Sequence, residues 1–225
     1  MGVKVSACLV TRGDVEMQPI IDSLSCFDEI VIWDNGARRI QRSDGWAEVC
    51  TDLSVYGRYA AIEYASHDLI YVVDDDVIVS DPQAIVQAWV SAAYGALGDQ
   101  WHLSLDDVQA VSRREHVVCN MPPEFRHDFY TDHALVGFGA AFHRDAPQRA
   151  FDRLLGTRDC WNGVQTEWFH NTCDIVFTGL TPRVLVDIPK TNLPWAEDDN
   201  RMYRQPSHIS ERQRMLDLVR QVRDR

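Results

Sequence analysis

Lysine is almost absent from this sequence. Of its 22 basic residues only Lys4 and Lys190 are lysines, and the others are arginines. Acidic residues number 34, so the formal net charge is −12. A surface this negative argues against a broad, non-specific grip on nucleic acid, while a local basic groove stays compatible with the composition. Because arginine binds phosphate through a planar, bidentate fork, single arginines are the candidates for phosphate contacts.

Paired cysteines and long apolar runs are also missing. The six cysteines contain no Cys-x-x-Cys pair: Cys8, Cys26, Cys50, Cys119, Cys160 and Cys173. Most lie in apolar surroundings, which favours reduced, buried thiols over a disulfide framework. No run approaches the ~18 apolar residues of a membrane span, and the N-terminal segment is too short and too mixed for a signal peptide. These absences predict a soluble, cytoplasmic protein.

The length of 225 residues and the 45% hydrophobic composition fit a single α/β domain over residues 1–225. Residues 3–10 and 29–33 are short apolar runs that predict strands. Residues 15–24 between them have helical spacing, and Asp14 is the expected cap of that helix. Such a βαβ unit predicts two parallel strands that lie side by side.

Three consecutive aspartates interrupt the most apolar stretch of the chain, residues 69–79, Leu-Ile-Tyr-Val-Val-Asp-Asp-Asp-Val-Ile-Val. The apolar run predicts a strand buried on both faces. Asp74, Asp75 and Asp76 should therefore lie at its carboxyl end, where open α/β sheets bind ligands. Strand alternation would point Asp74 and Asp76 the same way, as two oxygen ligands for Mg²⁺ or Mn²⁺. The competing interpretation is a solvated acidic turn.

The remaining elements follow from the spacing of apolar residues and from turn signals. Helices are predicted over residues 56–66, from Pro82 to about Leu97, and over 145–155, 161–180 and 207–223. Strands are predicted at residues 47–50, 102–105, 108–111, 116–119, 134–143 and 184–188, whereas Arg38, Arg39 and Arg42 are expected in a polar loop. The closely spaced runs between 102 and 119 predict a small antiparallel excursion beside a mostly parallel, helix-flanked sheet.

This layout resembles the GT-A glycosyltransferases, and it is most similar to their exostosin-like and small family-2-like members. The resemblance rests on a βαβ start, an acidic residue closing the second strand, an arginine in the following helix, and a buried strand ending in Asp-x-Asp. It implies a single Rossmann-like GT-A domain, a nucleotide-sugar donor, with a uridine diphosphate sugar expected, and a Mn²⁺ or Mg²⁺ ion.

The nucleotide contacts that the resemblance implies come from the first two strands. Thr11 and Arg12 match positions that hold the base and ribose, as do Asp34 and Asn35 at the end of the second strand. Arg58 matches an arginine that reaches the diphosphate. The alternatives are an ordinary Asp-Asn-Gly turn and an exposed helix arginine.

The metal and sugar contacts come from the later motifs. By resemblance Asp76, with Asp74 directly or through water, holds the metal, and Asp75 faces the ribose or the donor sugar. Gly139 belongs to a glycine-containing strand, residues 137–141, beside the sugars. The alternative for this stretch is a bulge in a strand.

Two further positions match weaker parts of the family pattern. Asp174 corresponds to an acceptor-side carboxylate, a general base or a binder of hydroxyl groups, although Cys173 stands where glutamate is usual. His208 corresponds to a third metal or diphosphate ligand. The alternatives are a helix cap for Asp174 and a surface side chain for His208.

Two other function classes compete with a glycosyltransferase. The Val-Val-Asp-Asp-Asp-Val stretch also resembles the opening motif of haloacid-dehalogenase-type phosphatases, in which Asp74 would be the nucleophile and Asp76 the acid. That motif usually begins its fold, whereas a complete βαβ unit precedes it here. A non-catalytic nucleotide-sugar-binding protein is the third class. The acceptor stays open between a saccharide and, if the protein is of phage origin, a modified DNA base.

Overall fold

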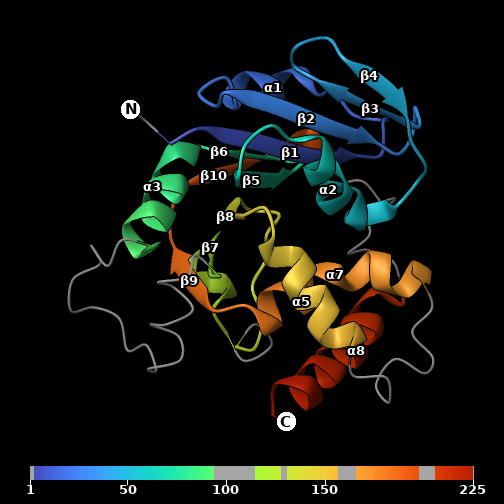
Figure 1. Ribbon diagram of the computed structural model, residues 1–225, viewed down its shortest axis with the longest axis vertical. Coiled ribbons are helices and arrows are strands. Elements are labelled where there is room, and N and C mark those ends of the chain that lie inside the picture. Colours follow the sequence, from blue (N-terminus) through green and yellow to red (C-terminus); the bar gives the residue numbers. More distant parts are fainter. Residues whose placement is uncertain (1–2, 94–114, 128–130, 157–165, 198–205, 225) are drawn as a thin grey trace.

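The computed structural model describes residues 3–93, 115–127, 131–156, 166–197 and 206–224 (Figure 1). Its centre is an eight-stranded sheet. In spatial order the strands are β4 (Ala47–Val49), β3 (Arg39–Arg42), β2 (Glu29–Asp34), β1 (Val5–Thr11), β5 (Leu69–Asp74), β8 (Ala140–His143), β7 (Val117–Asn120) and β9 (Arg183–Val186).

The sheet is mostly parallel in direction. Strands β2 and β5 flank β1 and run parallel to it, and β7 runs parallel to β9. Only β3 and β8 run against the other six, because each pairs antiparallel with both of its neighbours. A second sheet of two antiparallel strands, β6 (Val77–Val79) and β10 (Lys190–Asn192), leaves from the end of β5. The predicted α/β class with a mostly parallel, helix-flanked sheet is confirmed.

Helices cover both faces of the sheet. They are α1 (Gln18–Ser23), α2 (Gly57–Ala60), α3 (Pro82–Ala93), α5 (Ala146–Leu155), α7 (Thr166–Leu180) and α8 (His208–Arg223), with single 3₁₀ turns η1 (Ser54–Tyr56), η2 (Ala61–Tyr64), η3 (Pro123–Phe125) and η5 (Pro194–Glu197). Figure 1 shows α5, α7 and α8 gathered in the lower half of the view, and these three helices contact one another.

Strand alternation divides the apolar core into two layers. Along β1, Ala7 and Leu9 belong to the core that α1 and α3 cover, whereas Cys8 and Val10 belong to the core on the side of α2, α5, α7 and α8. Because successive side chains of a strand point to opposite faces, a fully apolar strand such as β1 feeds both layers. This burial on two faces explains why β1 and β5 are continuous apolar runs.

Several local predictions need correction. The segment expected as a polar loop contains β3, which pairs with β2 as an antiparallel neighbour. Helix α1 begins at Gln18 with no side-chain cap, so Asp14 does not cap it. The helix predicted over 56–66 is one short α-helical turn between the 3₁₀ turns η1 and η2.

Other predictions are confirmed in part. The strand predicted over residues 134–143 begins only at Ala140. Residues 116–119 correspond to β7, while the runs at 102–105 and 108–111 lie outside the described residues. Within the described ranges, no helix is both long and apolar enough to cross a membrane. Five cysteines there carry free thiols, and three of them are buried, Cys8, Cys119 and Cys173.

Candidate functional site at the strand ends

Three neighbouring parallel strands end together and bring polar residues to one edge of the sheet. Thr11 and Asp34 are the last residues of β1 and β2 and are paired across the two strands. Asp74 is the last residue of β5 and is paired with Val10, one residue before Thr11. The carboxyl ends of adjacent parallel strands are where open α/β sheets bind ligands. The structure therefore brings together the residues that sequence reasoning placed at these strand ends.

The three aspartates form a tight turn. Strand β5 stops at Asp74, residues 75–76 make the turn, and β6 starts at Val77. Because Asp76 lies outside the strand, the strand-alternation argument for pairing it with Asp74 does not apply. Asp75 is buried, and its carbonyl oxygen accepts a hydrogen bond of 2.7 Å from the indole of Trp195.

The backbone on the far side of the turn is fixed as well. The carbonyl oxygen of Asp76 accepts a hydrogen bond of 2.7 Å from the amide of Leu193. This bond and the pairing of β6 with β10 tie the acidic turn to residues more than a hundred positions later in the chain. The aspartates are therefore presented by an ordered turn.

Asp74 is held on two sides. Its Oδ1 accepts a hydrogen bond of 2.5 Å from Nη2 of Arg58, in helix α2. A Cβ atom at Gly137 would overlap Oδ2 of Asp74, and the Asp74 amide donates to the Gly137 carbonyl oxygen at 2.9 Å. Glycine is needed at position 137 because the backbone there passes directly against the carboxylate.

Arg58 is a buried cation between two carboxylates. Only 3% of its surface is exposed. Besides Asp74, it lies near Asp174 of helix α7, with Nη1 3.9 Å from Oδ2. Burial lowers the pKa of the guanidinium, but Asp174 and Asp74 outweigh burial, and the pKa is raised overall. Arg58 is therefore charged, and its Nε and Nη1 atoms are buried without a hydrogen-bond partner.

Tyr59 completes this network from the next position of helix α2. Its hydroxyl donates a hydrogen bond of 2.6 Å to Oδ1 of Asp174. Burial raises the pKa of Tyr59 well above its ordinary value, and the adjacent Asp174 carboxylate raises it further, so the tyrosine stays protonated. Burial and Asp174 likewise raise the pKa of Cys173 far above its usual range, so this thiol is not a nucleophile. Sequence reasoning missed Tyr59, whose only signal was its place beside Arg58.

The residues at the ends of β1 and β2 shape the loops that follow. Asp34 Oδ1 accepts a hydrogen bond of 2.8 Å from the amide of Ala37, as in an Asx turn. Asn35 donates to the Ser54 carbonyl oxygen and accepts from the Leu53 amide, at 3.1 and 3.0 Å. Asn35 is therefore a structural tie between the end of β2 and η1.

The first strand ends in a similar local arrangement. Thr11 is buried and accepts a hydrogen bond of 3.1 Å from the amide of Gly13. Arg12 pairs with Asp14 at 2.9 Å. Arg12 is half-buried and directly follows the end of β1, so it supplies a cation at this edge of the sheet.

Gly139 and His208 are placed differently from the other candidates. Gly139 has a φ of +102°, and a side chain there would press on Tyr71 and Ile85, so the core explains this glycine. His208 begins helix α8 and is half-buried. Burial and Arg212 lower its pKa to about 4, which leaves a neutral imidazole. Asp74, Asp76 and His208 do not form a metal-binding group; in the described part of the chain no cluster of three or more His, Cys, Asp or Glu side chains does.

The carboxylates at the strand ends fit a hard divalent cation whose remaining ligands are water and substrate phosphates. Asp76 and Asp74 supply carboxylate oxygens, and Mg²⁺ is typically held by one or two carboxylates plus water and substrate phosphates. Such a site needs no third protein ligand. A search of the chain against models of protein families, and against curated proteins, gives no match.

Proposed function

We propose that the protein is a metal-dependent glycosyltransferase that takes a sugar from a nucleoside diphosphate sugar, with a uridine diphosphate sugar as the expected donor. The observation that carries this proposal is the meeting of Asp34, Thr11 and Asp74–Asp76 at the carboxyl ends of β2, β1 and β5. A ligand with a ribose at one end and a diphosphate at the other would span these three strand ends.

Asp76 is the principal candidate for the metal ligand, and Asp74 contributes its charge directly or through water. One oxygen of Asp74 is bound to Arg58, and the other packs against Gly137. Asp76 is half-buried at the turn. When bound, a Mn²⁺ or Mg²⁺ ion would neutralise charge that develops on the departing nucleoside diphosphate.

Arg58 acts on this site as a positioning residue. Arg58 is only 3% exposed, and its guanidinium binds Asp74. It is therefore placed to fix this carboxylate rather than to contact the phosphates. Asp174 lies near Arg58, and Tyr59 holds Asp174 through a hydrogen bond. We therefore assign the direct phosphate contact to Arg12, the half-buried arginine that follows β1 at the same edge.

Asp34 and Asp174 are proposed to bind hydroxyl groups. The Asp34 oxygen that does not accept from Ala37 can accept from a ribose hydroxyl. Arg58 lies between Asp174 and Asp74, and 15% of the Asp174 side chain is exposed. Because one of its oxygens already accepts from Tyr59 and the other lies near Arg58, we assign it to orienting an acceptor hydroxyl rather than to removing the proton.

A phosphatase mechanism is the second candidate. It would need Asp74 as the nucleophile, but the bond from Arg58 ties down one oxygen of that carboxylate. Lys190, a possible partner for such a nucleophile, donates to Asn192 at 2.9 Å and lies over the ring of Phe138. Neither observation favours attack by Asp74.

The proposal is tested by a thermal-shift screen of nucleotide sugars, with and without Mn²⁺. A uridine diphosphate sugar is expected to raise the melting temperature only when the metal is present. Mass spectrometry of the same mixtures would then detect free or transferred sugar. Binding that does not depend on metal, or no binding by any nucleotide, would refute the proposal. Release of inorganic phosphate from a phosphate monoester, lost in Asp74→Asn, would support the phosphatase instead.

A further inference from the structure

A hollow lies between the α2–η2 segment and the start of helix α5, with Trp33 of β2 in its wall. It has a volume of about 480 Å³, within the range of small-molecule sites. Its walls contain five aromatic side chains, Trp33, Tyr56, Tyr59, Tyr64 and Phe151. None of the proposed nucleotide or metal ligands lines it.

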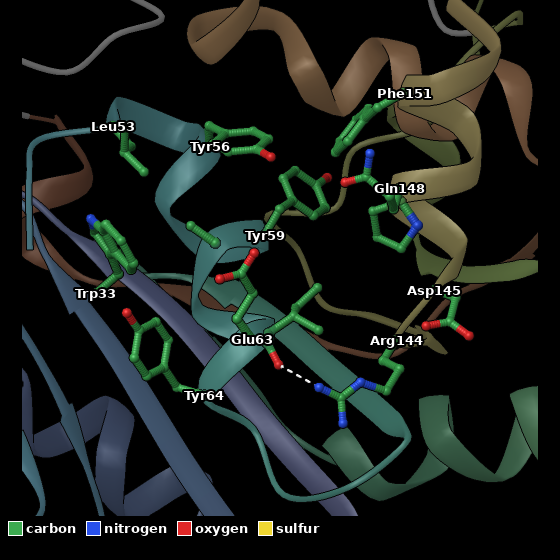
Figure 2. A pocket seen from close by; sticks show the side chains of 13 residues that line it. Trp33, Leu53, Tyr56, Tyr59, Glu63, Tyr64, Arg144, Asp145, Gln148 and Phe151 are labelled. Carbon is green, nitrogen blue, oxygen red and sulfur yellow. Dashed lines mark hydrogen bonds between the residues drawn. The ribbon is translucent and has the colours of Figure 1, made fainter.

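The aromatic rings surround a carboxylate. Figure 2 shows Trp33 and Tyr64 on one side of Glu63 and Tyr56 and Tyr59 on another, with the Glu63 carboxylate pointing into the space between them. These rings are held in place: Trp33 donates its indole N–H to the Thr51 carbonyl oxygen at 2.9 Å. Tyr56 and Tyr64 are the partly exposed rings of the wall, and Trp33, Tyr59 and Phe151 are buried.

Three charged residues line the hollow, and Glu63 is the one for which the described residues provide no counter-ion. Arg144 also lines it, but its guanidinium donates to the carbonyl oxygen of Ile62 at 3.1 Å and of Ala65 at 3.4 Å. Asp145 lies 3.9 Å from the guanidinium of Arg149 and 3.5 Å from the imidazole of His143. For Glu63 the structure records neither a hydrogen bond nor an ion pair with any described residue.

Aromatic faces and a carboxylate attract the same kind of ligand. The negative face of an aromatic ring binds ammonium groups, most strongly for tryptophan and then tyrosine. A carboxylate adds direct charge attraction, and the net charge of −12 favours the approach of cations. Because Glu63 is exposed, its charge is hydrated in the free protein, and a cationic ligand gains an attraction that a neutral ligand lacks.

We propose that this hollow binds an organic cation with an alkylammonium head group, held between the aromatic walls and paired with Glu63. The volume exceeds that of a trimethylammonium group alone, so the ligand carries a further chain or substituent. None of the residues proposed to bind the metal or the nucleotide lines this hollow, although Tyr59 is shared with the Asp174 network.

The test compares choline with its neutral isostere 3,3-dimethylbutan-1-ol, which differs in having carbon in place of the charged nitrogen. Binding is followed by the indole N–H signal of Trp33 in ¹⁵N-labelled protein, assigned with Trp33→Phe. Choline is expected to bind about tenfold more tightly than the isostere, and Glu63→Gln to remove most of that difference. Tyr64→Leu is expected to weaken choline binding several-fold, whereas Asp76→Asn leaves it unchanged.

Three outcomes would overturn this proposal. The first is equal binding of choline and its isostere, which would show an apolar site without charge selection. The second is choline binding that Glu63→Gln leaves intact. The third is a Trp33 shift caused by a neutral disaccharide such as cellobiose but not by choline, which would reassign the hollow to saccharides. Far-UV circular dichroism of each variant establishes that it is folded, as expected for the exposed side chain of Glu63.

Discussion

The carboxylates at the amino ends and at the carboxyl ends of β1, β2 and β5 differ in how many hydrogen bonds they accept. At the amino end, Glu29 of β2 accepts hydrogen bonds from Ser6 Oγ at 2.6 Å and from the amide and hydroxyl of Ser66 at 2.7 and 2.8 Å. Arg42 lies 3.5 Å away. At the carboxyl end, Asp74 has a single charged partner, Arg58, and 38% of its side chain is exposed.

This contrast separates a structural carboxylate from a candidate functional one. Burial raises the pKa of Glu29, but the bonds from Ser6 and Ser66, with the charge of Arg42, outweigh burial and lower the pKa overall. A carboxylate with three hydrogen bonds and a nearby guanidinium stabilises the fold and has most of its acceptor sites occupied. The acidic turn at the other end has its backbone fixed, and its partly exposed Asp74 belongs to the cation site that we propose.

Replacement of Arg58 with methionine should have the largest effect on stability. The change removes a buried cation and leaves Asp174 and Asp74 facing each other, so we expect a loss of about 3 kcal/mol in the free energy of unfolding. Urea denaturation measures it. Arg39→Met is the matched control, because Arg39 is exposed on β3 and should cost under about 0.5 kcal/mol. Equal effects of the two changes would contradict the role given to Arg58.

Replacement of Glu29 with glutamine tests the amino end. The amide has the same shape as the carboxylate, but one of its two oxygens is replaced by an NH₂ group that faces the donors of Ser6 and Ser66. We therefore expect a loss of about 2 kcal/mol in the free energy of unfolding. Because the folded-state pKa of Glu29 is lowered, its contribution is present above the ordinary glutamate pKa and is lost as the pH falls through the folded value. Glu29→Gln should therefore flatten the acid limb of the stability curve. Glu48→Gln on the exposed β4 strand should leave that limb unchanged.

A different group should control stability at milder acidity. His116 is buried, stacks on Trp89 at 5.1 Å, and has its pKa lowered to about 4 mainly by burial. The unfolded histidine takes up a proton near pH 6.5 while the folded one does not. Stability should thus fall by about 2 kcal/mol between pH 7 and pH 5 on account of this residue. A fluorine- or carbon-detected NMR titration of the imidazole, with urea melts at both pH values, checks it; a pKa near 6.5 in the folded protein would contradict it.

Much of the fold follows from local sequence patterns. Continuous apolar runs identified β1, β2 and β5, and the position of the aspartates after such a run placed them at a strand end. The β3 strand was missed because its arginines and glutamine gave no apolar alternation, and its place comes from pairing with β2. Propensity gives little signal for such a short, polar strand.

The site was less predictable than the sheet. Gly137, Trp195 and Leu193 reach the acidic turn from distant parts of the chain, and contacts of that range are set by tertiary packing. The resemblance to GT-A glycosyltransferases implied that Arg58 reaches the diphosphate, with an exposed helix arginine as the alternative. Folding instead buries Arg58 between Asp74 and Asp174, two carboxylates that no pattern in the sequence pairs with it.

The smallest expected effect on stability accompanies the largest expected effect on ligand binding. Asp76→Asn changes a half-buried turn residue and should alter the free energy of unfolding by under about 0.5 kcal/mol. Asp68→Asn is the matched control, because Asp68 lies exposed at the opposite end of β5. The decisive measurement is calorimetric titration of uridine diphosphate into each protein with Mn²⁺ present. The account predicts binding by the wild type and Asp68→Asn, and loss of binding in a folded Asp76→Asn variant. Undiminished binding by Asp76→Asn would contradict it.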